Sequence, residues 1–179
     1  FDLTTLNGPN GFVVNGQDGG RSLGASVSRI GDLNGDGIDD FVISDPEFMF
    51  MGRQLAGQTY VVFGRDVENE GDFVSPFDPA ALDGTNGFII GGRYSNDKLA
   101  TSVSGVGDIN NDGFDDLVIG APEADPNNQS RAGEVYVIFG RNTGFTSSFN
   151  LNTLDGTNGF TIDGLNAGDE LGTIVSAAG

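Results

Sequence analysis

The chain of 179 residues contains no cysteine and no histidine. Without cysteine no disulfide can form, so the sequence does not reveal a redox compartment. With both residue types missing, the chain also lacks the usual zinc ligands, the usual proton acceptor at neutral pH and a thiol nucleophile. These absences exclude the common catalytic arrangements that are built on histidine or cysteine.

Basic residues are also few: 8 lysines and arginines stand against 26 acidic residues, which gives a net charge of −18. They are scattered singly, whereas binding to nucleic acid or to an anionic membrane needs clustered positive charge. No apolar run approaches the roughly 20 residues of a membrane-spanning helix. We therefore expect no nucleic-acid partner and no membrane insertion, and an acidic surface that suits solubility and cations.

Glycine, by contrast, is abundant, with 30 residues, and short runs of valine, isoleucine and phenylalanine lie between the glycines. This composition is typical of strands and turns. An internal repeat organises the runs: Asn10-Gly11-Phe12 recurs as Asn86-Gly87-Phe88 and as Asn158-Gly159-Phe160, at offsets of 76 and then 72 residues. We divide the chain into a first repeat, a second repeat and the start of a third, which span residues 1–76, 77–148 and 149–179.

Within each full repeat, β-branched and apolar runs bounded by glycine, asparagine or aspartate predict four short strands. The predicted strands span residues 11–15, 25–30, 40–44 and 58–63 in the first repeat, and 87–90, 101–106, 116–120 and 134–139 in the second. Units of four strands favour an all-β fold of tandem four-stranded antiparallel blades, as in a β-propeller. A β-sandwich is the alternative, but a sandwich does not need such a close repeat.

Two segments carry the clearest chemistry, residues 32–40 and 108–116, and both read D-x-N-x-D-G-x-D-D. Oxygen side chains at positions 1, 3, 5 and 9 converge if the chain curls tightly, the glycine at position 6 permits the turn, and the carbonyl at position 7 can point inward. Calcium accepts about six to eight oxygen ligands in a flexible shell, whereas magnesium demands a stricter octahedron. We predict about two Ca²⁺ per chain. The predicted ligands are Asp32, Asn34, Asp36, Ile38 and Asp40 in the first loop, and Asp108, Asn110, Asp112, Phe114 and Asp116 in the second.

The loops are similar to an EF-hand loop but lack its last ligand, because Ile43 and Ile119 stand where an EF-hand has a bidentate glutamate. The residues around these isoleucines predict a strand, so we expect each ion in a strand–loop–strand hairpin. The alternative is an ordinary turn without metal, since Asp, Asn and Gly favour turns. Three carboxylates at ligand positions within nine residues, found twice in register, argue against that alternative. Asp39 and Asp115, at position 8, are expected to point outward as solvated charges.

Residues 106–122 read V-G-D-I-N-N-D-G-F-D-D-L-V-I-G-A-P, and with the preceding Phe63-Gly64 they resemble the FG-GAP repeat of integrin α-subunit head domains. The first copy departs from the family pattern, with Ser44-Asp45-Pro46 in place of Gly-Ala-Pro. The resemblance implies an integrin-α-like β-propeller, incomplete in this chain, with calcium in the blade hairpins and with exposed loops that recognise protein or carbohydrate partners. About two blades cannot close a ring, so we expect either an excerpt of a longer propeller, which we favour, or copies joined through open blade edges.

Three functions are compatible with these patterns. The first is a calcium-stabilised recognition, adhesion or scaffold module that is extracellular, secreted or on the cell surface, where calcium is abundant enough for weak sites. The second is a self-assembling subunit of a surface layer, matrix or filament. The third is a segment of a hydrolase with paired carboxylates, which is disfavoured because the best-organised acids are committed to calcium and no serine has a histidine partner. We therefore expect no catalytic residue and no enzyme activity.

Two further predictions concern loops and core. Residues 45–57 and 123–131 are the longest and least patterned turns, which makes them candidate contact loops for a partner. Six phenylalanines recur at equivalent places of the repeats, and we expect them to form core between blades. They are Phe1, Phe12, Phe77, Phe88, Phe149 and Phe160.

Overall fold

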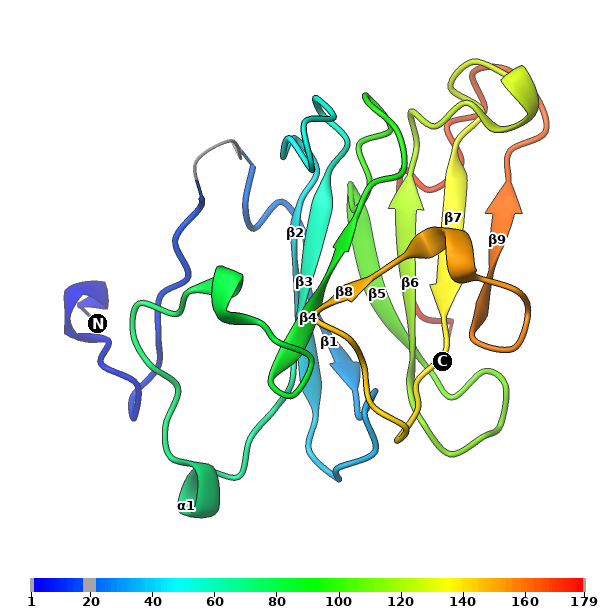
Figure 1. Cartoon of the computed structure of the whole chain (residues 1–179). Helices are drawn as coiled ribbons and strands as arrows, with labels where there is room; N and C mark the ends of the chain where they lie inside the picture. The colour runs from blue at the N-terminus through cyan, green and yellow to red at the C-terminus, as the bar shows by residue number, and fades with distance from the viewer. Residues whose placement is uncertain (1, 18–21, 179) are drawn as a thin grey trace.

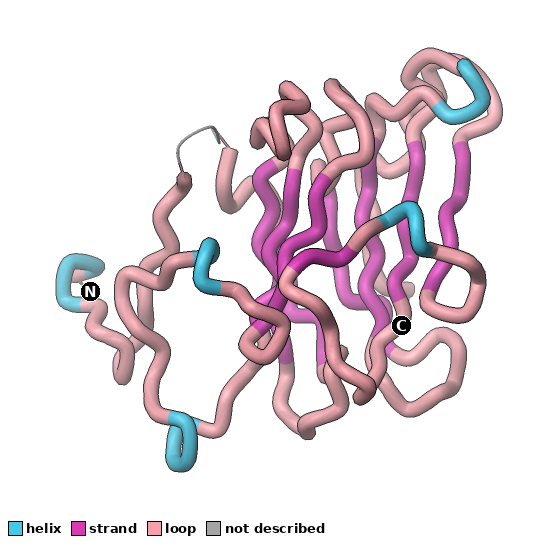
Figure 2. Tube along the Cα trace, viewed as in Figure 1, coloured by secondary structure: helices cyan, strands magenta, loops and turns pink. Residues whose placement is uncertain are grey.

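Two β-sheets lie side by side in the computed structural model, which describes residues 2–17 and 22–178 (Figure 1). The first sheet consists of β1 (Val27–Gly31), β2 (Asp40–Asp45), β3 (Gln58–Val62), β4 (Gly87–Gly91) and β8 (Ser148–Phe149). The second sheet consists of β5 (Ser102–Gly107), β6 (Asp116–Ala121), β7 (Glu134–Ile138) and β9 (Gly159–Asp163). Within the described residues, helical structure is limited to single turns, as Figure 2 shows: α1 (Val67–Glu70) and the 3-10 turns Leu3–Thr5, Pro79–Ala81, Pro126–Asn128 and Leu151–Thr153.

Each sheet is a meander of four antiparallel strands, in the order β1-β2-β3-β4 in one sheet and β5-β6-β7-β9 in the other. The short strand β8 joins the outer edge of β4 in parallel. Seven of the eight predicted strands are confirmed within two residues at each end. The sheets therefore have the predicted form of tandem four-stranded antiparallel blades.

The predicted strand over residues 11–15 is wrong. This segment forms only isolated bridges, between Gly8 and Gly11 and between Val14 and Phe77. It corresponds by the repeat to β4, and β4 pairs with the third strand of the preceding unit. The described residues include no strand ahead of residues 11–15 that is equivalent to β3. The backbone N–H and C=O groups of residues 11–15 therefore have no neighbouring strand with which to form the hydrogen bonds of a sheet.

Sheet boundaries and repeat boundaries do not coincide. Strand β4 belongs to the second repeat but completes the sheet of the first, and β9 belongs to the third repeat but completes the sheet of the second. Each sheet thus takes three strands from one repeat and its fourth from the next. This exchange ties successive repeats together through backbone hydrogen bonds in addition to side-chain packing.

The main core lies between the two sheets. Strand side chains alternate between the two faces of a sheet, and Val61 points into the core between the sheets while Tyr60 and Val62 belong to a separate cluster. The second sheet contributes Ile119 and Tyr136 to the shared core, both almost fully buried. Because burial of each large apolar side chain is worth about 1.5–3 kcal/mol, this shared cluster is what holds one blade against the other.

The recurring phenylalanines divide between core and surface. Phe88 and Phe149 lie in the core between the sheets, and Phe77 is buried in the cluster around Tyr60, against which Phe12 packs. Phe160 is 38% exposed on β9, so the expectation of burial is wrong for this residue. The remaining one, Phe1, lies outside the described residues.

The inner strands of the two blades approach each other closely at Gly105 on β5. A Cβ atom at this position would lie 2.5 Å from Cα of Ile30 and 2.9 Å from the carbonyl oxygen of Arg29, both on β1. These are backbone atoms, which cannot rotate away as a side chain can. The absence of a side chain at Gly105 is therefore a condition for the packing of the blades.

We predict that Gly105→Ala lowers the free energy of unfolding by about 1–3 kcal/mol, the usual range for an overpacked core, as measured by urea denaturation. Gly16→Ala is the matched control, because its new Cβ would meet only Leu23, at an ordinary 3.8 Å. Equal stability of the two variants would contradict the close approach of β1 and β5.

Candidate functional site

The two acidic loops occupy equivalent places, in the hairpin between β1 and β2 and in the hairpin between β5 and β6. Both lie at the same end of the sheets, the lower end in Figure 1. Each hairpin has an irregular register just before its loop, at Gly31 and at Gly107, whose φ angles are 70° and 71°. A left-handed glycine at this place turns the chain out of the first strand and into the loop.

The first aspartate of each loop organises the backbone around itself. The Asp32 carboxylate accepts hydrogen bonds from the backbone N–H groups of Gly35 (2.7 Å), Asp36 (3.1 Å) and Gly37 (2.8 Å). In the second loop, the Asp108 carboxylate accepts from the N–H groups of residues 112 (3.0 Å) and 113 (2.8 Å). The predicted tight curl of the loops is therefore present.

The side chains at positions 3 and 5 of each loop are joined by a hydrogen bond. The Asn34 side-chain amide donates to Asp36 at 2.8 Å, and Asn110 donates to Asp112 at the same distance. The other carboxylate oxygen of the residue at position 5 accepts the N–H of the residue at position 7, Ile38 or Phe114. These side chains thus lie side by side within each loop.

The aspartate at position 9 is buried in both loops, with Asp40 1% and Asp116 0% exposed. Each carboxylate lies between two backbone donors 2.9 Å away: Leu33 and Gly64 for Asp40, and their counterparts Ile109 and Gly140 for Asp116. Burial raises the pKa of Asp40 to about 7 and also raises the pKa of Asp116, although the N–H donors act in the opposite direction.

The loops offer the oxygen atoms that calcium prefers, and a carboxylate oxygen that accepts one N–H group keeps a further lone pair. Within residues 2–17 and 22–178, however, no group of three or more acidic side chains converges closely enough to hold a metal ion. The chemistry of the donors fits calcium, while the joint coordination by the ten predicted ligands stays a prediction.

The expectation for position 8 is wrong for Asp115. Its side chain does not point into solvent: it crosses to the neighbouring blade, where Oδ2 accepts the backbone N–H of Asp32 at 2.8 Å. Asp39, its counterpart in the first loop, is exposed as expected and forms an ion pair with Arg29. The sequence pattern is the same at both positions, so only the contact between blades distinguishes them.

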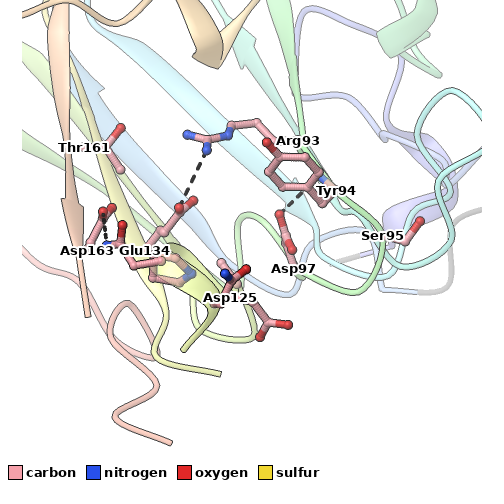
Figure 3. A pocket seen from close by; sticks show the side chains of 12 residues that line it. Arg93, Tyr94, Ser95, Asp97, Asp125, Glu134, Thr161 and Asp163 are labelled. Atoms are coloured by element: carbon pink, nitrogen blue, oxygen red, sulfur yellow. Dashed lines mark hydrogen bonds and ion pairs between the residues drawn. The ribbon is translucent and has the colours of Figure 1, made fainter. Parts of the chain in front are cut away.

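A cavity of about 610 Å³ opens at the opposite end of the blades, and sequence reasoning did not identify it as a site (Figure 3). The loop after β4 contributes Arg93, Tyr94 and Asp97, and Glu134 comes from the start of β7. The Arg93 guanidinium lies 5.5 Å from the ring centre of Tyr94, and one of its terminal nitrogens is 3.7 Å from Glu134. The cavity therefore combines an aromatic ring with charges of both signs.

One acid of this cavity, Asp97, is strongly affected by its burial. Burial raises the pKa of Asp97 to about 6, and the nearby Glu134 carboxylate acts in the same direction. Glu134 also accepts a hydrogen bond from the Tyr136 hydroxyl, and burial raises the pKa of that phenol.

Both predicted contact loops line cavities at this end. Residues 124–128, within the predicted loop 123–131, form one wall of the cavity around Arg93. Phe50, Met51 and Arg53, within the predicted loop 45–57, line a second cavity of about 290 Å³.

In the described part of the chain, no helix is both long and apolar enough to cross a membrane.

Comparisons with known proteins agree with this architecture. The family model described as the FG-GAP repeat matches residues 23–62 and 100–138, each of which covers the first three strands of one sheet and its acidic hairpin. A phosphatidylinositol-glycan-specific phospholipase D of Dictyostelium discoideum is 30% identical over 99% of this chain, and the match covers 18% of that protein. The bovine protein of the same name is 34% identical over 65% of the chain, and integrin alpha-5 of Xenopus laevis is 30% identical over 81%; each match covers 13% of the relative.

The chain thus spans less than a fifth of the length of each of these relatives. The similarity extends over both sheets and falls on the strands and hairpins that the structure shows to be equivalent. The chain is therefore a member of the FG-GAP repeat family, and its two repeats form adjoining blades of an incomplete β-propeller.

Proposed function

We propose that this chain is a calcium-stabilised extracellular module for recognition or adhesion, with no catalytic activity of its own. The observation that carries the proposal is the pair of acidic hairpin loops, each curled around its own first aspartate at the same end of adjoining blades. The similarity to integrin alpha-5 supports an adhesive role. An extracellular location suits loops of this type, because calcium is abundant there.

In this proposal, calcium supplies a positive charge that offsets the mutual repulsion of the loop carboxylates. Asp32, Asn34 and Asp36 hold the ion from the exposed part of the first loop. Asp40 connects that loop to the rest of the blade, because its carboxylate accepts N–H groups from Leu33 and from Gly64, which follows β3. Fixing the loop therefore fixes the ends of three strands.

The absence of catalysis is proposed on chemical grounds. The chain has no histidine or cysteine to act as a base or thiol nucleophile. Its relatives named phospholipase D are enzymes by name, but this chain corresponds to less than a fifth of their length. We assign their activity to those whole proteins and a binding role to the repeats.

The partner-binding surface in this proposal is the end opposite to the calcium loops. Tyr94 is 60% exposed beside the cavity that contains Arg93 and Glu134. An exposed aromatic ring next to polar groups of both signs suits a protein side chain or a sugar ring, which both present apolar and hydrogen-bonding surfaces.

A second candidate function, self-assembly into a surface layer, matrix or filament, is favoured by the outer strand of the second sheet. Phe160 and Ile162 on β9 are 38% and 46% exposed, whereas their counterparts Phe88 and Ile90 on β4 are fully buried between the sheets. A further blade or another copy of the chain would cover this face. Exposed apolar strands are common contact sites between chains.

We predict that calorimetric titration of the chain with calcium shows two sites, both lost in the double variant Asp36→Ala with Asp112→Ala. At ten times the dissociation constant, each ion stabilises the fold by about 1.4 kcal/mol, so two ions raise the melting temperature by roughly 5–10 °C. The matched control is Glu68→Ala with Asp72→Ala, which removes two exposed acids outside the loops. Absence of binding up to several millimolar calcium would overturn the metal assignment.

We predict that Tyr94→Ala weakens binding to an array of purified matrix proteins and glycans by about tenfold or more, as is usual for an aromatic contact at the centre of an interface. Val74→Ala removes another exposed apolar side chain, 67% exposed and outside the cavity lining, and should leave binding unchanged. If a partner found on the array bound Tyr94→Ala as tightly as the wild type, the cavity would not be the contact site.

Analytical ultracentrifugation over rising protein concentration tests the self-assembly candidate. If it holds, the chain sediments as larger species, and Ile162→Lys restores the monomer because a charge on β9 blocks the apolar contact. Leu165→Lys, which places the same charge on an 84% exposed residue just beyond the strand, should leave assembly intact. A monomer at all concentrations excludes this function for the chain.

A further inference from the structure

We propose that Asp115, a residue of the second acidic loop, holds the first acidic loop in its binding shape, so that the two loops act as one coupled unit. This inference rests on the proposed calcium function for its consequence, but its structural part concerns contacts within the chain alone. Asp115 is a positioning residue in this scheme and does not itself touch the ion.

The backbone of Asp32 is held on both sides by Asp115. The Asp32 N–H donates to Oδ2 of Asp115 at 2.8 Å, and the Asp115 N–H donates to the Asp32 carbonyl at 3.1 Å. The side chain of the same Asp32 accepts the N–H groups that curl the first loop. Asp115 therefore fixes the residue around which the first loop is built.

The Asp115 carboxylate occupies a space that only a glycine leaves open. A Cβ atom on Gly31 would overlap the Asp115 side chain, because the nearest atoms to that position are Oδ2, Cγ and Cβ of Asp115. Gly107, the counterpart of Gly31 in the second blade, has almost the same φ, but the nearest atom to its Cβ position, Oδ1 of the same Asp115, is 4.0 Å away, which is an ordinary contact. An alanine at either position would meet the same backbone strain, so the two positions differ in how closely the Asp115 carboxylate packs against them.

A second path of hydrogen bonds joins the buried aspartates of the two loops. The Gly140 N–H donates to Asp116, and the next residue, Arg141, donates its N–H to the carbonyl of Leu33 at 2.8 Å. The Leu33 N–H in turn donates to Asp40. This path passes mainly through buried groups, where hydrogen bonds are well shielded from water.

The arrangement is asymmetric. Asp39, the counterpart of Asp115, forms its ion pair with Arg29 of its own sheet. Among the described residues, no hydrogen bond from another sheet reaches the backbone of Asp108 in the way that Asp115 reaches Asp32. The first loop therefore depends on the second for its shape, and occupancy of either loop should raise the calcium affinity of the other by the same factor.

The first test isolates the first loop. In chains of all 179 residues that carry Asp112→Ala, calorimetry with calcium reports on residues 32–40 alone. Adding Asp115→Ala is expected to weaken this site about tenfold, in line with loss of a hydrogen bond to a charged group. Adding Asp115→Asn should weaken it by less than threefold, since the amide oxygen still accepts the Asp32 N–H.

Asp39→Ala in the same background is the matched control, because it removes the equivalent carboxylate from the first loop itself. It should change the affinity by less than about twofold. The inference is overturned if Asp39→Ala weakens the site as much as Asp115→Ala does, or if Asp115→Asn is as weak as Asp115→Ala. Either result would show that the loss of charge, and not the contact between blades, sets the affinity.

The second test uses no calcium, and it therefore tests the contact between Asp115 and Asp32 separately from the proposed function. In metal-free protein, amide hydrogen exchange at Asp32 should accelerate at least tenfold in Asp115→Ala and stay near the wild-type rate in Asp115→Asn and in Asp39→Ala. Unchanged exchange in Asp115→Ala overturns the inference. If the wild type binds no calcium, the proposed function fails, and the exchange rates still decide whether Asp115 holds the first loop.

A double-mutant cycle on metal-free unfolding gives a third measurement. Gly31→Ala should destabilise the chain more than Gly107→Ala, and the excess should disappear when Gly31→Ala is combined with Asp115→Ala, because the overlapping carboxylate is then absent. An excess that persists in the combined variant would show that Gly31 is needed for another reason and would contradict the packing of Asp115 against it.

Discussion

The buried carboxylates of Asp40 and Asp116 are the contacts on which the rest of each blade depends. Each lies at the start of a second strand and accepts one N–H from the acidic loop and one from the segment after the third strand. Burial of a charge is costly, and it raises the pKa of both groups. The two backbone donors offset that cost, so the loop, the second strand and the end of the third are held at one point.

The aromatic-glycine signature of the repeat has its reason in the same contact. Gly64 and Gly140 donate the N–H groups that these carboxylates accept, and a Cβ at either glycine would overlap the carbonyl oxygen of Asp39 or Asp115. A side chain here would push the third strand away from the loop and break the hydrogen bond. The glycine, the buried aspartate and the residue before that aspartate therefore form one packing unit.

The two ends of the blades differ in character. At one end, acidic loops are linked to each other from blade to blade by hydrogen bonds between backbone groups and by one to the Asp115 side chain. At the other end, longer loops leave cavities lined with polar and aromatic side chains. In the function that we propose, the first end stabilises the module and the second contacts a partner, with strands of five or six residues between them. Such a separation lets the contact loops vary without disturbing the loops that hold the fold.

The sequence by itself determined the features that are local in the chain. Strands β2 and β6, which are short apolar runs that begin at an aspartate, the curl around Asp32 and Asp108, and the repeat were all predictable, because turn chemistry and β propensity act over a few residues. Tertiary structure alone decided the rest. Residues 11–15 form no strand because the partner that the repeat requires is not among the described residues, and Phe160 is exposed while Phe88 is buried because only Phe88 lies between two sheets. Asp39 and Asp115 share one sequence pattern, yet only Asp115 reaches a neighbouring blade. Their different surroundings come from contacts between residues 83 positions apart, which no local pattern encodes.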